Sequence, residues 1–259
     1  MNEPKNIDGD SGSSLQSATA HLAELAGSKQ LVLLGDQVGV SQHVRFVADS
    51  LPELYSAGVT NLAWEFTNDR SQKQLDDLLS AELWEESRCI ELFVDLLGIG
   101  FTYREYADVL KAAWSLNRTL PTDADSFRVI GLGLPTYVED PQLLDGRSAA
   151  ELELRNWWMG GHYRDVAAFH MANMLTNEVL RSGQRAVVLL SAERTTTRLI
   201  QWVDGVPTVS VGNLLYRWMG EGIARAVFHG AVADSGAIER VESLVAGAPE
   251  QPDQFGISL

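Results

Sequence analysis

Four short, mainly apolar segments constrain the fold of this chain more than any other feature. They occupy residues 31–34, 59–66, 127–132 and 185–190. Segments of this length and composition are typical of strands that are buried on both faces of a sheet. Patterns typical of helices lie between them, at about 42–57, 71–80, 83–97, 102–117 and 163–181. Strands that alternate with helices predict an α/β fold: a mostly parallel sheet, helices on both of its faces and a helical insertion around 71–117.

The predicted strands and helices form one domain. A chain of 259 residues is long enough to bury a single large core without disulfides or metal ions. We expect this α/β domain to span 15–247, after a disordered polar leader at 1–14 and before a loose tail at 248–259. A first helix is predicted over about 15–26. Beyond the fourth apolar segment we expect strands near 206–211 and 226–229 and a helix at 237–245.

Charge and cysteine content argue against several classes of protein. The sequence has 35 acidic and 20 basic residues and a formal net charge of −15. Such a surface repels phosphate groups, so we expect no nucleic-acid partner and no membrane partner. No apolar run approaches the roughly 20 residues of a membrane span, and the first residues lack the pattern of a signal peptide, which predicts a cytoplasmic protein. The single cysteine, Cys89, excludes an internal disulfide, and its apolar neighbours predict a buried thiol.

Polar residues at the carboxyl ends of the predicted strands are the candidates for function, because ligands of open parallel sheets bind at that edge. Asp36 and Gln37 follow the first strand, Glu65 lies at the end of the second, and Glu193 and Arg194 follow the fourth. A purely structural interpretation is open for both buried carboxylates. Asp36 would then be a helix N-cap, and Glu65 would be the partner of a buried arginine. Gln37 and Glu193 are candidates for ligand binding.

The loops after these strands lack the common cofactor and nucleophile motifs. The glycines of Gly35-x-x-x-Gly39 do not have the G-x-G-x-x-G spacing of a dinucleotide site, and no Gly-Lys-Ser/Thr of a P-loop follows them. The sequence also has no G-x-S-x-G elbow of an α/β-hydrolase.

Five segments, in order along the chain, carry a resemblance to a known group of proteins: LVLLGDQVGVSQHVRFVADSLPELYSAGVTNLAWEF, RSQKQLDDLL, FTYREYADVLKAAWSLNR with FRVIGLG, YRDVAAFHMANML and RAVVLLSAERTTTR. Together they resemble the ChaN-like superfamily, which includes haem-binding uptake proteins, the erythromycin esterases and the Tiki/TraB proteases. The resemblance covers about residues 30–200. It implies an α/β fold with one pocket, lined by glutamates and by the histidines of two Gly-x-x-His motifs. Metal binding or general-base chemistry is ascribed to those histidines in catalytic members.

Both of those histidines are replaced in this chain. The first motif reads Gly-Asp-Gln-Val, so that Asp36 shortens the glutamate and Val38 replaces the histidine. The second reads Ser-Ala-Glu-Arg, so that Arg194 replaces the histidine, whereas Glu65 is kept. Valine cannot ligate a metal ion, and arginine stays protonated. The resemblance with these replacements therefore implies a pocket without a metal ion and without the histidine base of the family.

The altered pocket allows two arrangements of charge. In one, Arg194 pairs with Asp36 or Glu65, which keeps the carboxylates ionised and makes them poor general acids. In the other, Arg164 and Arg194 hold a carboxylate of the substrate and leave Glu65 or Asp36 as the general base. The second arrangement is our hypothesis. Asp165, next to Arg164 in the Arg-Asp pair of the resembling helix, is then a ligand-binding candidate.

Two histidines are candidates for a replacement base. His43 lies at the start of a predicted helix, near the position of a second histidine that ChaN-type members often carry, and a plain surface position is the alternative. His162 follows two glycines and precedes Tyr163, Arg164 and Asp165, a composition typical of a pocket loop.

Aromatic residues leave a haem-binding alternative open. Trp64 and the segment 157–159 (Trp-Trp-Met) predict either core packing or an apolar wall for a flat ligand. Haem is the alternative cofactor, since ChaN resembles a haem binder and Tyr103, Tyr137 or His162 would ligate the iron. Under the main hypothesis no cofactor is expected.

The sequence thus predicts a metal-independent intracellular enzyme that acts on a small molecule or peptide. Its acid–base chemistry would rest on Asp36 and Glu65, with Arg164 and Arg194 as electrostatic clamps. The alternatives are a haem- or ligand-binding protein of the ChaN type and a catalytically dead member that acts as an interaction partner. The substrate, the reaction type and the oligomeric state are left open.

Overall fold

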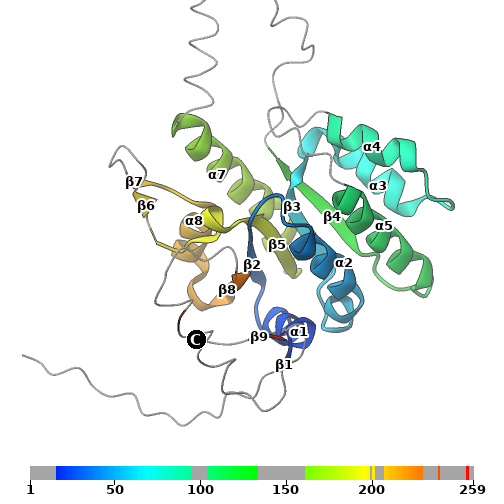
Figure 1. Ribbon diagram of the computed structural model, residues 1–259, viewed down its shortest axis with the longest axis horizontal. Helices are drawn as coiled ribbons and strands as arrows, with labels where there is room; N and C mark the ends of the chain where they lie inside the picture. The colour runs from blue at the N-terminus through cyan, green and yellow to red at the C-terminus, as the bar shows by residue number, and fades with distance from the viewer. Residues whose placement is uncertain are drawn as a thin grey trace, which may run out of the picture.

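A five-stranded parallel sheet is the centre of the computed structural model of this protein (Figure 1). Its strands, in spatial order, are β4 (Arg128–Gly133), β3 (Asn61–Asn68), β5 (Ala186–Ser191), β2 (Leu31–Asp36) and β8 (Ile223–Val227). Every neighbouring pair is parallel. The structure describes residues 16–94, 104–133, 161–198, 200–201, 207–229, 239 and 255–256. The predicted α/β fold with a mostly parallel sheet is confirmed.

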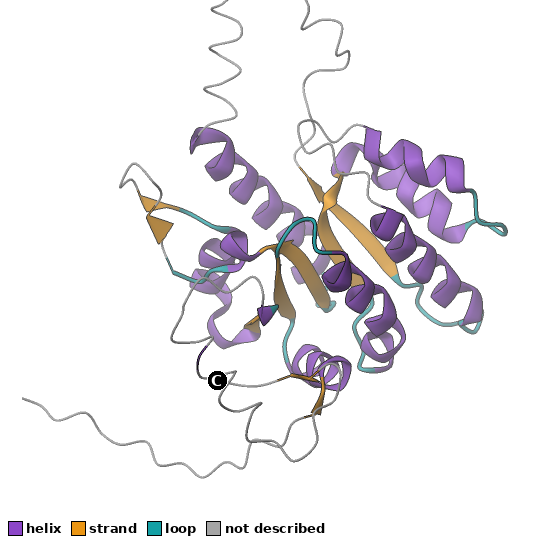
Figure 2. Cartoon of the chain, viewed as in Figure 1, coloured by secondary structure: helices purple, strands orange, loops and turns teal. Residues whose placement is uncertain are grey.

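Helices cover both faces of this sheet (Figure 2). One face packs against α1 (Ala18–Ser28), α2 (Ser41–Ser56), α3 (Gln72–Ser80), α4 (Glu86–Val94) and α5 (Arg104–Thr119). The other face packs against α7 (Gly161–Leu175) and α8 (Val211–Met219). Because side chains alternate along a strand, Val32 and Leu34 belong to the first core and Leu31 and Leu33 to the second. The apolar strands are buried on both faces, as their composition predicts.

In the described residues 71–94 and 104–117, the predicted helical stretch is present and forms part of one covering layer. It comprises the turn η1 (Asp69–Ser71) and the helices α3, α4 and α5. Apolar side chains at helical spacing, such as Leu75, Leu78 and Leu79 of α3, are buried in the first core. Their burial holds these helices on the same side of the sheet as α2.

The last third of the chain differs from the sequence prediction. The strand predicted at 206–211 is only β7 (Pro207–Thr208), which pairs with β6 (Ile200–Gln201) in a separate two-stranded sheet. The helix α8 follows at once, because Ser210 caps it by accepting a hydrogen bond from the Asn213 N–H at 3.0 Å. The β-branched residues before and after Ser210 had favoured a strand. The turn η5 (Gly220–Gly222) then leads to β8, which begins three residues before the strand predicted at 226–229 and overlaps it.

The two ends of the chain are described only in part. The leader predicted at 1–14 lies outside the described residues, as does the helix predicted at 237–245 except for Glu239. Of the tail predicted as loose, β9 (Phe255–Gly256) pairs with β1 (Gln16–Ser17) in an antiparallel ladder. Among the helices that the structure describes, none is long and apolar enough to cross a membrane.

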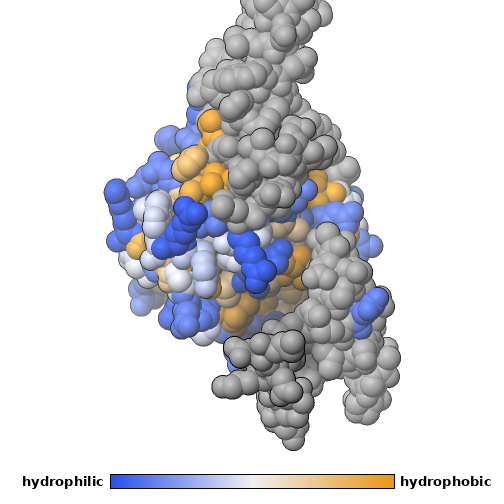
Figure 3. Space-filling view, turned by 90° about the vertical axis from the view of Figure 1, so that its left-hand side faces the viewer, coloured by the Kyte–Doolittle hydropathy of each residue, from blue (hydrophilic) through white to orange (hydrophobic). Residues whose placement is uncertain are grey.

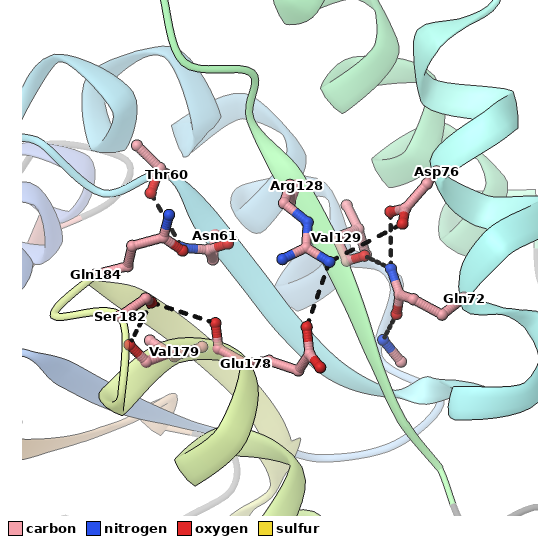
Figure 4. Close-up of polar contacts among 11 residues, drawn as sticks. Thr60, Asn61, Gln72, Asp76, Arg128, Val129, Glu178, Val179, Ser182 and Gln184 are labelled. Carbon is pink, nitrogen blue, oxygen red and sulfur yellow. Dashed lines mark hydrogen bonds and ion pairs between the residues drawn. The ribbon is translucent and has the colours of Figure 1, made fainter.

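Polar side chains join the covering layers at the edge strand β4 (Figure 4). The Nη2 atom of Arg128 lies 3.4 Å from Glu178 Oε2 in the π-helical turn η3 (Thr176–Leu180) and 3.9 Å from Asp76 Oδ2 in α3. The Gln72 amide donates to Val129 O at 2.9 Å and accepts from the Gly131 N–H at 2.9 Å. Gln72 therefore occupies backbone groups that a neighbouring strand would otherwise pair.

Several large apolar side chains of α7 and α8 remain exposed. They are Val166 and Phe169 on α7 and Tyr216 and Trp218 on α8. Figure 3 views the molecule from the side that carries these two helices and shows apolar surface there.

Candidate functional site

A buried carboxylate–imidazole pair lies where β2 passes into α2. Asp36 is the last residue of β2 and is 2 % exposed. Its Oδ1 atom lies 2.6 Å from Nδ1 of His43, which is in the first turn of α2 and has a side chain that is 12 % exposed. Within the described part of the chain, Asp36 Oδ2 and His43 Nε2 have no hydrogen-bond partner. The pair thus holds one imidazole nitrogen and leaves the other available.

A second pair lies at the carboxyl end of β3. Glu65 is 7 % exposed, and its Oε1 atom accepts a hydrogen bond from the Ser191 backbone N–H at 2.7 Å. Its Oε2 atom lies 2.9 Å from Nε of Arg194 in the turn η4 (Ala192–Thr195). Both carboxylate oxygens are therefore occupied by donors. Of the two partners for Arg194 that the sequence left open, the structure has Glu65.

The two pairs stand on opposite sides of β5. Asp36 is in register with Ser191 of β5, and Glu65 accepts from that residue's N–H on the other side. Two strand spacings separate the carboxylate-bearing strands by roughly 10 Å. Side-chain alternation continues from Leu34 to place Asp36 on the α2 face, and from Ala63 to place Glu65 on the α7 face. Each carboxylate has its own nitrogen donor.

Two glycines allow the turn η4 to pack closely against β2 and α8. A Cβ on Gly35 would lie 3.0 Å from Ala192 Cα, and one on Gly212 would lie 2.3 Å from Thr195 O. A side chain at Gly35 would push η4 away from β2, and one at Gly212 would push it away from α8. These two glycines set how closely the segment that carries Arg194 approaches β2 and α8.

A further arginine contacts the same turn. Arg225 of β8 donates from Nε to Thr195 Oγ1 at 3.0 Å, and that hydroxyl donates to Ala192 O at 2.7 Å. Partial desolvation lowers the pKa of Arg225 below its ordinary value. Among the described residues it has no carboxylate within ion-pair distance. Sequence reasoning did not select Arg225, because nothing local marks a strand arginine that reaches a turn 30 residues earlier.

The remaining predicted site residues are placed as follows. Trp64 is fully buried in the first core and donates from Nε1 to Thr67 Oγ1 at 2.9 Å, so the structure puts it in core packing and not in a ligand wall. Gln37 and Glu193 are exposed in the loop after β2 and in η4. Tyr103, Tyr137 and the segment 157–159 lie outside the described residues. His162, Arg164 and Asp165 belong to the first two turns of α7, and their side chains are not among those described.

The thiol of this chain is not a nucleophile at neutral pH. Cys89 is fully buried in α4, which confirms the predicted buried thiol. Burial raises the pKa of Cys89 to about 12, with Glu86 and Asp108 adding to the shift. Since the thiolate is the reactive form, Cys89 is inert in the folded protein.

The donor set does not resemble a metal site. Among the described side chains, no three His, Cys, Asp or Glu residues gather where they could hold a metal ion. Asp36 and Glu65 already accept hydrogen bonds from His43 and Arg194, and the guanidinium of Arg194 has no lone pair to offer.

A small cavity lies beside the start of α2. It has a volume of about 30 Å³ and is lined by Gly39, Val40, Ser41, Val44, Glu105 and Tyr106. Ligand pockets usually measure about 300–1,000 Å³, so this cavity does not fit a haem.

Comparison with known proteins shows similarity of fold alone. No protein-family model matches this sequence, and no curated protein matches it. Among solved structures, the C-terminal region of Pasteurella multocida toxin, described as carrying a thiol-protease-like catalytic triad, aligns with a TM-score of 0.51 at 14 % identity over 94 % of this chain and 26 % of the toxin chain. ChaN of Campylobacter jejuni, described with cofacial haem binding, aligns with a TM-score of 0.50 at 10 % identity over 84 % of this chain and 91 % of ChaN.

A further bacterial protein toxin aligns with a TM-score of 0.50 at 14 % identity over 95 % of this chain and 39 % of the toxin chain. The present chain therefore spans well under half of the toxin chains that it matches. The similarity to ChaN supports the predicted ChaN-like fold.

Proposed function

We propose that this protein is an enzyme that acts on a small molecule or peptide through general acid–base chemistry, with His43 as the base and Asp36 as the group that orients it. The observation that carries the proposal is the 2.6 Å contact between Asp36 Oδ1 and His43 Nδ1. Substrate proton transfer would take place at Nε2 of His43. This assigns the base to His43, where the sequence hypothesis preferred a carboxylate.

The chemistry of a carboxylate–imidazole pair supports this assignment. A carboxylate beside Nδ1 accepts a hydrogen bond from the Nδ1–H group, so the neutral imidazole keeps its lone pair on Nε2. The same carboxylate stabilises the imidazolium that forms when Nε2 takes a proton from water or from a substrate group. A buried carboxylate with a single imidazole contact, at the edge of a parallel sheet where ligands bind, is suited to this role.

Glu65 and Arg194 take a different role in this proposal. Because Glu65 accepts from both the Ser191 N–H and Arg194, we assign it to anchoring η4 at the edge of the sheet. Arg194 uses only Nε in this contact within the described residues, so its terminal N–H groups remain for an anionic group of the substrate. Arg164, whose side chain is not described, stays a proposed second clamp.

The proposed mechanism needs no metal ion at these residues. His43 supplies the base, Asp36 fixes it, and Arg194 supplies positive charge for a developing oxyanion or a substrate carboxylate. Cys89 takes no part, since it is buried and protonated. The immediate nucleophile would be water or a substrate group.

The proposal is tested first without a substrate. ¹⁵N-edited NMR spectra recorded at neutral pH should show that His43 carries its proton on Nδ1. The His43 signal is identified by its loss in the His43→Gln variant. Asp36→Asn should shift His43 toward the commoner Nε2-protonated form. A wild-type His43 that carries its proton on Nε2 would refute the proposed base.

Turnover provides the second test. Carboxylate-bearing esters, lactones and peptides are screened with a pH indicator, and any activity found should fall by about 100-fold or more in His43→Gln. The matched control is His21→Gln in α1. Equal activity in both variants would contradict the assignment.

A further inference from the structure

Phe228, the residue after β8, contacts the backbone next to Asp36 and the side chain of His43. The backbone N–H of Phe228 donates to Gly35 O at 3.1 Å, directly before Asp36. The Phe228 ring is stacked on the imidazole of His43, with ring centroids 4.1 Å apart and planes inclined by 4°. One residue therefore holds the strand that carries the acid and covers the face of the base.

Phe228 is itself fixed by α2. Phe46, one turn after His43 on the same helix, meets the Phe228 ring edge-on at 5.5 Å and 89°. Phe46 is 7 % exposed and belongs to the first core. The stack His43–Phe228–Phe46 thus ties the end of the last sheet strand to the first turns of α2.

We propose that Phe228 is a positioning residue for the general base: it holds the imidazole plane of His43 so that Nδ1 faces Asp36 and Nε2 faces the reacting group. This inference rests on the proposed function of the Asp36–His43 pair. It assigns no contact with the substrate to Phe228.

Two constraints are needed to fix an imidazole. The second side-chain torsion of histidine is broad and roughly two-fold, so a ring turned by half a turn costs little by itself. The hydrogen bond to Asp36 fixes one edge of the ring, and a parallel aromatic ring at 4.1 Å restricts its plane. The Phe228 ring covers one face of the imidazole, whose side chain is 12 % exposed. The stack therefore supplies the second constraint.

The experiment compares three variants of the full chain by ¹⁵N-edited NMR. In Phe228→Leu, the single Nδ1-protonated signal of His43 should be lost and replaced by an average of the two tautomers. Phe228→Tyr, which keeps the ring, should restore the wild-type signal. Leu51→Ala, which removes a fully buried core side chain of the same helix outside these three rings, should lower the unfolding midpoint and leave the His43 signal unchanged.

Each outcome decides the proposal. An unchanged His43 signal in folded Phe228→Leu protein would overturn it, and so would loss of the signal in Leu51→Ala, which would show an effect of packing in general. If Phe228→Leu does not fold, the Tyr and Leu51→Ala variants still decide: a perturbed signal in folded Phe228→Tyr would overturn the proposal. Failure of the proposed function is recognised separately, because Asp36→Asn would then also leave the His43 signal unchanged.

Discussion

Glutamine in place of Glu65 should destabilise the folded protein by about 2–3 kcal/mol. Glu65 is 7 % exposed and accepts two hydrogen bonds, from the Ser191 N–H at 2.7 Å and from Arg194 Nε at 2.9 Å. Hydrogen bonds to a charged group contribute about 1.5–3 kcal/mol each, and breaking a fully buried ion pair costs about 3–5 kcal/mol. Glutamine retains an acceptor for one donor, and the Arg194 side chain is 21 % exposed, so water recovers part of the loss.

The assay is urea unfolding followed by circular dichroism, arranged as a double-mutant cycle. The coupling energy between Glu65→Gln and Arg194→Gln should be about 1–2 kcal/mol. Each single variant leaves the other partner without its counter-charge, and the double variant removes that penalty. The exposed pair of Arg45 and Glu105, with an N–O distance of 3.0 Å and side chains 62 % and 20 % exposed, is the matched control. Its coupling energy should stay below about 1 kcal/mol. Equal coupling in the two pairs would refute the reasoning that burial makes the Glu65 pair the anchor of η4.

Two further predictions concern stability. Gln72→Leu should lower the free energy of unfolding by about 1–3 kcal/mol, since it removes two hydrogen bonds to the backbone of β4. The control variant at the exposed Gln74, Gln74→Leu, should be nearly neutral. Equal urea midpoints for the two variants would contradict the contact between Gln72 and β4. Because the pKa of Cys89 is raised to about 12, the unfolded chain loses the thiol proton first. Wild-type stability should therefore fall above about pH 9 by up to ~1.4 kcal/mol per pH unit relative to Cys89→Ala, and parallel pH profiles would contradict this.

The sheet could be predicted because burial alone selects its strands. Continuous apolar segments leave little choice but a strand covered on both faces, and the four predicted segments became β2, β3, β4 and β5. The helix α8 could not be predicted in the same way. Its cap at Ser210 lies among β-branched residues, and its Gly212 is required by contact with η4, which no local pattern reveals.

The sequence predicted which polar residues lie at the carboxyl ends of the strands, but not which of them form pairs. The sequence placed Asp36, Glu65 and Arg194 at one edge of the sheet and left two partners open for the arginine. Which carboxylate pairs with Arg194 depends on the face of the sheet that each side chain occupies. Side-chain alternation gives that face only once the strand register is known. His43 was an alternative base because it lies at the start of a predicted helix, near the position of a second histidine that ChaN-type members often carry. Phe228 carried no signal, since its contacts join segments about 190 residues apart.

The side-chain amide of Gln72 also bears on how this protein can assemble. A sheet edge with free backbone groups is a template on which a second chain can add a strand. At β4 the Val129 carbonyl and the Gly131 N–H are already bonded to Gln72, and α3 holds that amide in place. Strand-by-strand growth from this edge is therefore blocked by a residue of the same chain, which lets β4 stay short and apolar without becoming a seed for fibres.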